Sequence, residues 1–126
     1  MKNAILINSA NQSVTLVQVG EYTDIYTHLG NDCTTFACPI SFDNEDTLYI
    51  DDEGLYHPFD GGFMLKDWSY PVVGNGLILG TDEEGDSVDC QTTVDDIIAQ
   101  IVWINKDVAQ NWSEEALNTP LTFISL

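Results

Sequence analysis

The sequence predicts a single α+β domain, built on an antiparallel sheet with two or three short helices. Short apolar runs with strand character recur between turn-forming residues, and the helical periodicities are brief. Strands and helices do not alternate regularly, as they would in a parallel α/β fold. The 126 residues, 44% of them hydrophobic, suffice for one domain with its own core.

The first predicted strands form a hairpin. Residues 4–7 are a short apolar run, residues 14–19 are rich in β-branched side chains, and the polar segment 8–13 connects them. Residues 21–29 are predicted to form a helix that Gly30 ends, because apolar side chains recur at helical spacing. Those side chains are Tyr22, Ile25, Tyr26 and Leu29.

Alternation and turn chemistry predict the next strands. Residues 33–42 alternate, which favours a strand with Phe36, Cys38, Ile40 and Phe42 on one side. A second hairpin is expected because residues 48–50 and 55–56 flank an acidic turn that ends at Gly54.

Glycines mark the following segments. Residues 61–68 fit a loop or an edge strand. Residues 72–79 fit one strand, in which Gly74 and Gly76 indicate a bulge or a close approach of backbone.

An acidic loop, residues 81–89, leads into the most distinct predicted helix. Thr92 and Thr93 are candidate N-caps, and Asp95 and Asp96 suit the positive end of the helix dipole. The apolar stripe of this helix is expected to comprise Val94, Ile97, Ile98, Ile101 and Val102. Residues 113–115 fit a further helical turn, and residues 121–126 an edge strand.

The charge balance is the feature of the sequence that is most informative about function. Three lysines, no arginine and 21 acids give a formal net charge of −18. Solubility alone needs a net charge of only about 2–8 for a small domain. This surface would repel nucleic acid and anionic membranes, so direct binding to either is not expected. Basic proteins and cations are the natural partners.

The expected compartment is the cytoplasm, or the host cytoplasm if the protein is encoded by a virus. The first apolar stretch, residues 4–7, is too short for the core of a signal peptide. An odd number of cysteines without an export signal indicates reduced thiols at Cys33, Cys38 and Cys90.

Thirteen of the 21 acids fall in two short clusters, both on predicted turns or helix starts. We predict that these residues bind a basic partner. The first cluster is Asp43, Glu45, Asp46, Asp51, Asp52 and Glu53. The second is Asp82, Glu83, Glu84, Asp86, Asp89, Asp95 and Asp96.

Two segments carry a resemblance to a known family. They read Leu48-Tyr49-Ile50-Asp51-Asp52-Glu53-Gly54-Leu55 and Gly74-Asn75-Gly76-Leu77-Ile78-Leu79-Gly80-Thr81-Asp82-Glu83-Glu84-Gly85. With them, the chain resembles small acidic phage and bacterial proteins catalogued only as a domain of unknown function, over roughly residues 4–104. The resemblance implies a small, soluble, intracellular protein, often encoded by a virus or a mobile element, and transfers no catalytic residue.

Size and charge also resemble those of the DNA-mimic inhibitors that phages direct against restriction, CRISPR and other nucleic-acid-binding proteins. Eighteen charges correspond to roughly 30 Å of duplex, at one charge per ~1.7 Å. A domain of this length has a radius of gyration of about 14 Å and hence a similar span. If both clusters share a face, their carboxylates could imitate phosphates.

No catalytic site, dedicated metal site or cofactor is predicted. The spacing of Asp82, Glu84 and Asp86 starts like a calcium loop, but its glycine is at position 4 rather than 6. Weak Ca²⁺ or Mg²⁺ binding stays open. His57 and Asp60 lack an accompanying nucleophile motif.

The hypothesis from the sequence is therefore a non-enzymatic inhibitor that blocks a basic host protein of the nucleic-acid-binding or defence class. The alternative is a phage or bacterial accessory protein-binding module whose acidity is only solvation. That alternative would depend on Trp68 and Tyr70. For these two residues and for Phe63, core packing is nonetheless favoured over an exposed anchor within an acidic rim. Whether the chain forms a homodimer stays open.

Overall fold

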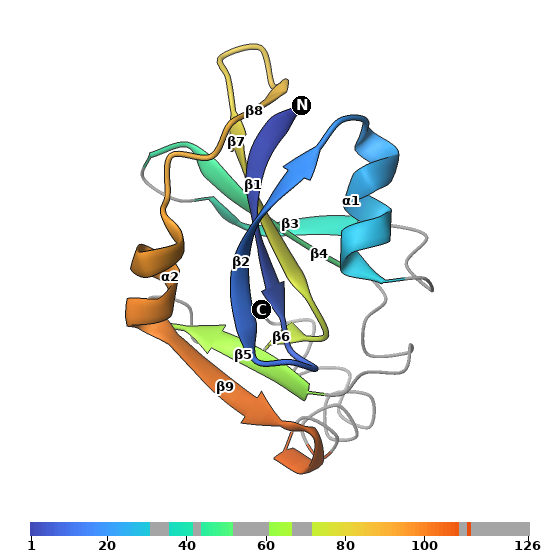
Figure 1. Cartoon of the computed structure of the whole chain (residues 1–126), viewed down its shortest axis with the longest axis vertical. Coiled ribbons are helices and arrows are strands. Elements are labelled where there is room, and N and C mark those ends of the chain that lie inside the picture. Colours follow the sequence, from blue (N-terminus) through green and yellow to red (C-terminus); the bar gives the residue numbers. More distant parts are fainter. Residues whose placement is uncertain (31–35, 42–43, 52–60, 67–71, 109–110, 112–126) are drawn as a thin grey trace, which may run out of the picture.

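The larger of two antiparallel sheets forms the centre of the fold in this computed structural model (Figure 1). The structure describes residues 1–30, 36–41, 44–51, 61–66, 72–108 and 111. The strand order of the large sheet is β2-β1-β7-β4-β3, with β8 paired to β7. Its strands are β1 (Lys2–Asn8), β2 (Ser13–Val19), β3 (Phe36–Ser41), β4 (Asp46–Asp51), β7 (Gly76–Thr81) and β8 (Ser87–Val88).

A small sheet with strand order β6-β5-β9 lies below the large one in Figure 1. Its strands are β5 (Gly61–Leu65), β6 (Val72–Val73) and β9 (Ile101–Asn105). The helices are α1 (Tyr22–Leu29) and α2 (Val94–Gln100), and residues 106–108 are again helical. The predicted α+β class, with antiparallel sheets and short helices, is confirmed.

The predicted first hairpin and first helix are confirmed. β1 pairs with β2 from Lys2↔Val19 to Asn8↔Ser13. At the start of α1, the Asp24 carboxylate accepts backbone hydrogen bonds from Gly20 (2.8 Å) and Glu21 (3.1 Å). These bonds, that from Gly20 foremost, hold the pKa of Asp24 below its usual value.

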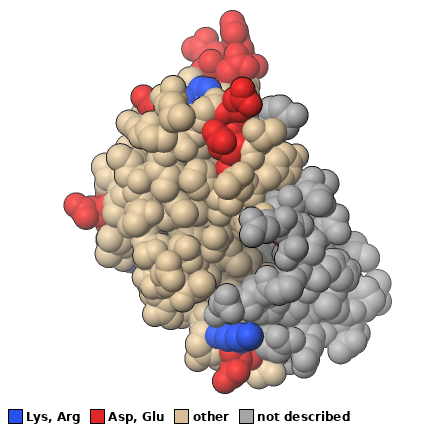
Figure 2. Space-filling model, turned by 45° about the vertical axis from the view of Figure 1, so that its right-hand side comes forward, with Lys and Arg blue, Asp and Glu red and all other residues tan. Residues whose placement is uncertain are grey.

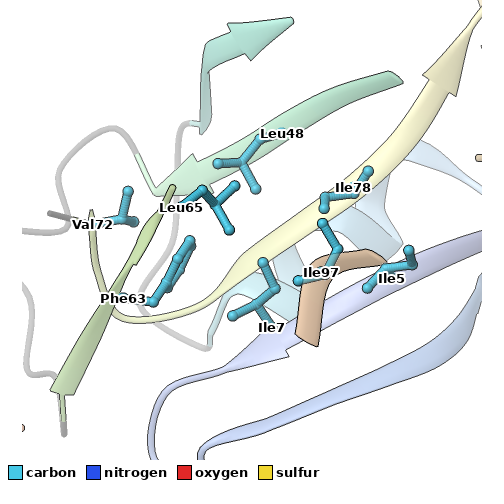
Figure 3. Packing of buried hydrophobic residues seen from close by; sticks show 8 residues of the cluster. All are labelled: Ile5, Ile7, Leu48, Phe63, Leu65, Val72, Ile78 and Ile97. Atoms are coloured by element: carbon cyan, nitrogen blue, oxygen red, sulfur yellow. The ribbon is translucent and has the colours of Figure 1, made fainter. Parts of the chain in front are cut away.

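Two apolar clusters cover the two faces of the large sheet. α1 packs on one face, where Ile25 and Leu29 meet Ala4, Val19, Leu77 and Leu79. The other cluster fills the space between the large sheet, the small sheet and α2 (Figure 3). Its buried members are Ile5, Ile7, Leu48, Phe63, Leu65, Val72, Ile78 and Ile97.

The single strand predicted over residues 72–79 is wrong. These residues form β6 and β7, which belong to different sheets. Gly74 lies between them with φ 82°, a conformation that only glycine adopts readily. The expected close approach is found at Gly76, where an added Cβ would lie 2.7 Å from Cζ of Phe63 and 3.0 Å from Cδ1 of Leu48.

Gly76→Ala should therefore lower the free energy of unfolding by about 1–3 kcal/mol, the usual cost of overpacking a core. Urea denaturation would measure it. The loss should shrink in a Phe63→Leu background, because the ring atom that the new methyl meets is gone. An equal loss in both backgrounds would contradict this account of Gly76.

The predicted apolar stripe of the second helix is also wrong at its end. Thr93 does cap α2, with its Oγ1 accepting from the Asp96 backbone N–H at 3.1 Å. The helix stops at Gln100, however, and the β-branched run that follows pairs with β5 as β9. Val102 therefore lies on a strand and is 57% exposed, and Ile98 is 54% exposed on the helix.

Strand pairing corrects three other expectations. Both edges of β4 are taken, by β3 and by β7, so residues 48–50 do not have the predicted hairpin partner at 55–56, which lies outside the described residues. β5 is the central strand of its sheet rather than a loop or an edge. Within the predicted strand 33–42, β3 covers residues 36–41, and a register shift between Ala37 and Ile40 breaks the expected alternation. Residues 113–115 and 121–126 lie outside the described part of the chain.

Candidate functional site

Pairing of β4 with β7 brings the first acidic cluster into contact with the second. Asp46 pairs with Gly80, and the Thr81 backbone N–H donates to the Glu45 carbonyl oxygen at 3.2 Å. The start of β4 thus lies beside the turn that follows β7. We call the exposed acids gathered here, together with half-buried Asp82, the acidic end: Glu45, Asp82, Glu83, Glu84, Asp86, Asp89, Asp95 and Asp96.

The turn between β7 and β8 is organised by one of its own acids. Asp82 Oδ1 accepts hydrogen bonds from the backbone N–H groups of Glu84 and Asp86, each at 2.9 Å. The backbone of Asp82 also bonds with Asp86 and Gly85, at 2.9 and 3.1 Å. Since these bonds define the turn, the side chains of Glu83, Glu84 and Asp86 are left exposed at its tip.

Asp46 is not a surface charge, and its assignment as a partner-binding residue is wrong. It is fully buried. Its carboxylate accepts from the backbone N–H of Gln91, at 3.0 Å to each oxygen, and from that of Thr92 at 2.7 Å. Asp46 therefore ties β4 to the segment that precedes α2.

A side-chain network around this carboxylate reinforces the same junction. Asn44 Oδ1 accepts from the Asp46 backbone N–H at 3.1 Å, and Asn44 Nδ2 donates to Thr92 Oγ1 at 3.0 Å. Gln91 Nε2 donates to the Asn44 carbonyl oxygen at 3.0 Å. Through these bonds the start of α2, with exposed Asp95 and Asp96, is held next to the start of β4.

Two other acids of the acidic end combine exposure with a local structural role. Asp89 Oδ1 accepts from the backbone N–H of Asn3 at 2.7 Å, which ties the segment after β8 to β1. Asp96 completes a capping box with Thr93, whose backbone N–H lies 3.3 Å from Asp96 Oδ2. The carboxylates of Asp89 and Asp96 thus stabilise the fold and also contribute to the surface charge.

The first acidic cluster does not stay together. Asp51 lies at the opposite end of β4 from Asp46, about 17 Å away at the usual rise per strand residue. Asp43, Asp52 and Glu53 lie outside the described residues. The hypothesis that both clusters form one display therefore holds only for Glu45 among the described acids of the first cluster.

Figure 2 shows how uneven the resulting charge distribution is on one face of the molecule. Acidic groups gather at its upper end, while much of the described surface below them is uncharged. Figure 1 places the β7–β8 hairpin at that same end and β9 at the opposite one. The acids therefore form a local feature of the fold.

The other described residues that the sequence analysis considered lie in the core or make contacts within the fold. Phe63 is fully buried in the core, which confirms the core packing favoured for it and excludes it as an exposed anchor. Trp103 packs against the same core. Burial, with a further contribution from the Asp46 charge, raises the pKa of the Cys90 thiol. His28, at the end of α1, lies with Nε2 3.2 Å from the Gln18 carbonyl oxygen. Trp68, Tyr70 and His57 lie outside the described residues.

Within the described part of the chain, no group of three or more His, Cys, Asp or Glu side chains is placed to hold a metal ion. None of the helices described is long and apolar enough to cross a membrane.

Comparison of the chain with protein-family models, curated proteins and solved structures found no match. The acidic end is therefore the feature from which a function can be inferred.

Proposed function

We propose that the protein is a non-enzymatic inhibitor whose acidic end occupies the nucleic-acid-binding surface of a basic host protein. The observation that carries this proposal is the pairing of β4 with β7, which adds Glu45 to the acids of residues 82–96. Carboxylates concentrated at one end of a domain attract a cationic surface, accelerate association and make it sensitive to salt.

The size of the acidic end indicates which kind of surface it would fit. Its eight carboxylates carry the charge of about 14 Å of duplex, roughly four base pairs. This is about half of the span that the total charge of the chain suggests. We therefore propose that the partner holds a short stretch of phosphates rather than a long duplex track.

A second candidate function is a protein-binding module whose acidity serves solvation and local structure. It is favoured by the hydrogen bonds that Asp46, Asp82, Asp89 and Asp96 accept from backbone N–H groups. These four acids are explained by the fold without any partner. Glu83, Glu84 and Asp86 are exposed instead, and no hydrogen bond of their carboxylates is found within the described residues.

The triple variant Glu83→Gln, Glu84→Gln, Asp86→Asn separates the two candidates. We expect it to keep wild-type stability, because Asp82 and the backbone bonds of the turn are unchanged. Each exposed ion pair contributes about 0.2–1 kcal/mol, so three lost pairs should weaken partner binding roughly 3- to 150-fold. The dissociation constant for a partner captured at low salt would measure this loss.

A charge-matched control is Asp107→Asn, Glu114→Gln, Glu115→Gln. Asp107 comes two residues after β9, the strand that lies at the opposite end of the molecule from the β7–β8 hairpin in Figure 1. Glu114 and Glu115 are separated from the acidic end in the sequence. This variant loses the same three charges and should bind within about twofold of wild type. Equal weakening in both variants would show that only net charge matters and would contradict a defined binding surface.

A further inference from the structure

The four strands at the ends of the two strand orders, β2, β3, β6 and β9, are protected from other strands to different degrees. β3 contains Pro39 and a register shift, and β6 has only two residues. On β2, the side chain of His28 reaches the Gln18 carbonyl oxygen. β9 has five residues, Ile-Val-Trp-Ile-Asn, with no proline, no charge and no register shift.

Hydrogen-bond alternation shows which backbone groups of β9 face away from the small sheet. The Lys66 backbone N–H donates to the Gln100 carbonyl oxygen at 3.1 Å, so Gln100 is directed toward β5. Because direction alternates along an antiparallel strand, Ile101, Trp103 and Asn105 direct their backbone N–H and C=O groups outward.

A second backbone hydrogen bond independently indicates the same backbone directions along β9. The Gly74 backbone N–H donates to the Gly61 carbonyl oxygen at 2.9 Å, so Gly61 is directed toward β6 and away from its β9 partner, Asn105. Of the outward groups, the Ile101 N–H is already used, since it closes α2 on Ile97 O. The Ile101 C=O, both groups of Trp103 and the Asn105 N–H have no hydrogen-bond partner within the described residues.

We propose that β9 pairs antiparallel with β9 of a second copy of this chain, about a two-fold axis at Trp103. In this register the two Trp103 residues exchange both backbone hydrogen bonds. The Asn105 N–H of each copy donates to the Ile101 C=O of the other. The four open groups of each strand then find partners, and the Ile101 N–H, which is already bonded, is not required. The two small sheets would become one continuous sheet of six strands.

The side chains fit the same arrangement. The outer face of the small sheet is apolar, with Val102 57% exposed and its neighbours Met64 and Ile104 half-buried. In the proposed register Val102 of one copy lies diagonal to Val102 and adjacent to Ile104 of the other, so these exposed apolar surfaces merge. An apolar strand edge of this kind, unpaired among the described residues, is a site where sheets associate.

Charge favours a second copy over a basic partner at this strand. Residues 101–105 are uncharged, so a cationic surface gains no attraction from them, whereas the acids of the turn between β7 and β8 lie at the far end of the molecule (Figure 1). Two copies repel through their net charge of −18 each, and salt screens that repulsion. Dimerisation should therefore strengthen with salt, whereas inhibitor binding through the acidic end should weaken.

Sedimentation equilibrium over a range of protein concentrations, at low and at high salt, tests the proposal on the full-length chain. We expect a dimer that is weak at low salt and at least tenfold tighter at high salt. Val102→Lys, which adds a charge to the open strand, should weaken it at least tenfold, with an unchanged thermal unfolding profile of the monomer.

Leu16→Lys is the matched control, because Leu16 is 58% exposed on another uncharged outer strand, β2, and the change in net charge is the same. We expect it to dimerise like wild type. A monomer at every concentration and salt level, or a dimer lost in Leu16→Lys but kept in Val102→Lys, would overturn the proposal. The triple variant at Glu83, Glu84 and Asp86 should also dimerise like wild type, so this test is independent of the inhibitor function.

Discussion

Replacing Asp46 with alanine should lower the free energy of unfolding by about 2–6 kcal/mol, because two backbone N–H groups lose their acceptor at about 1–3 kcal/mol each. The variant leaves the backbone N–H groups of Gln91 and Thr92 without their acceptor at a part-buried junction. It also removes the connection between β4 and the segment before α2. Urea denaturation followed by circular dichroism would measure the loss.

Two neighbouring variants make this result specific. Glu45→Gln changes an exposed acid one residue away and should stay within about 0.5 kcal/mol of wild type. Asp46→Asn retains one acceptor oxygen and should fall between the two. If Asp46→Ala is no less stable than Glu45→Gln, the junction does not depend on this carboxylate.

Asp46→Asn also tests the conclusion that Asp46 is not a partner-binding residue. Because Asp46 is buried, it does not reach a partner directly. Under conditions where Asp46→Asn is fully folded, partner binding should stay within about twofold of wild type. A large loss of binding in the folded variant would show that Asp46 does take part in partner binding.

Phe63→Ala should lower the free energy of unfolding by about 3–5 kcal/mol, as is typical when a buried aromatic ring is removed. Phe63 is fully buried on the central strand of the small sheet and packs in the cluster shared with Leu48, Ile7 and α2 (Figure 3). The ring is thus a main contact between the two sheets. Its removal leaves a cavity between them that backbone movement closes only in part.

The controls for Phe63 use its own substitution series and one strand neighbour. Phe63→Leu, which retains more of the volume, should lose clearly less stability than Phe63→Ala. Val102→Ala, at an exposed position on β9, should change it by about 0.5 kcal/mol or less. Comparable losses at Phe63 and Val102 would contradict the description of the core.

The sequence predicts well those elements whose determinants are local. The β1–β2 hairpin follows from two apolar runs and a polar connection, and α1 from helical spacing ended by Gly30. The N-terminus of α2 follows from Thr93 and Asp96, which bond to each other's backbone. The residues that specify each of these features lie within one short stretch of the sequence.

Other elements depend on partners that are distant in the sequence. The apolar run from Val94 to Val102 fits a helix throughout, and only β5 makes Ile101 and Val102 part of a strand. Likewise, residues 72–79 divide into two strands because Gly74 redirects the chain and each half finds a different sheet. Periodicity alone does not contain this information.

The candidate site likewise depends partly on local sequence and partly on contacts between distant residues. The clustering of acids is visible in the sequence, but strand pairing decides that Glu45 joins the hairpin acids and that Asp51 does not. Burial of Asp46 requires the backbone N–H groups of residues 91 and 92, which are 45 and 46 positions away. A preceding Asn44, which bonds both Asp46 and Thr92, is the only local sign of that junction among the described contacts.

The most direct measurement of the central claim is affinity capture from bacterial lysate at low salt, followed by a rising salt ramp, with duplex DNA added as competitor. Wild type and the Asp107, Glu114 and Glu115 control should retain the same basic nucleic-acid-binding protein. Salt and DNA should both release it, and the Glu83, Glu84 and Asp86 variant should lose it at lower salt. A partner that resists salt, ignores DNA and binds all three proteins equally would contradict an inhibitor that acts through the acidic end.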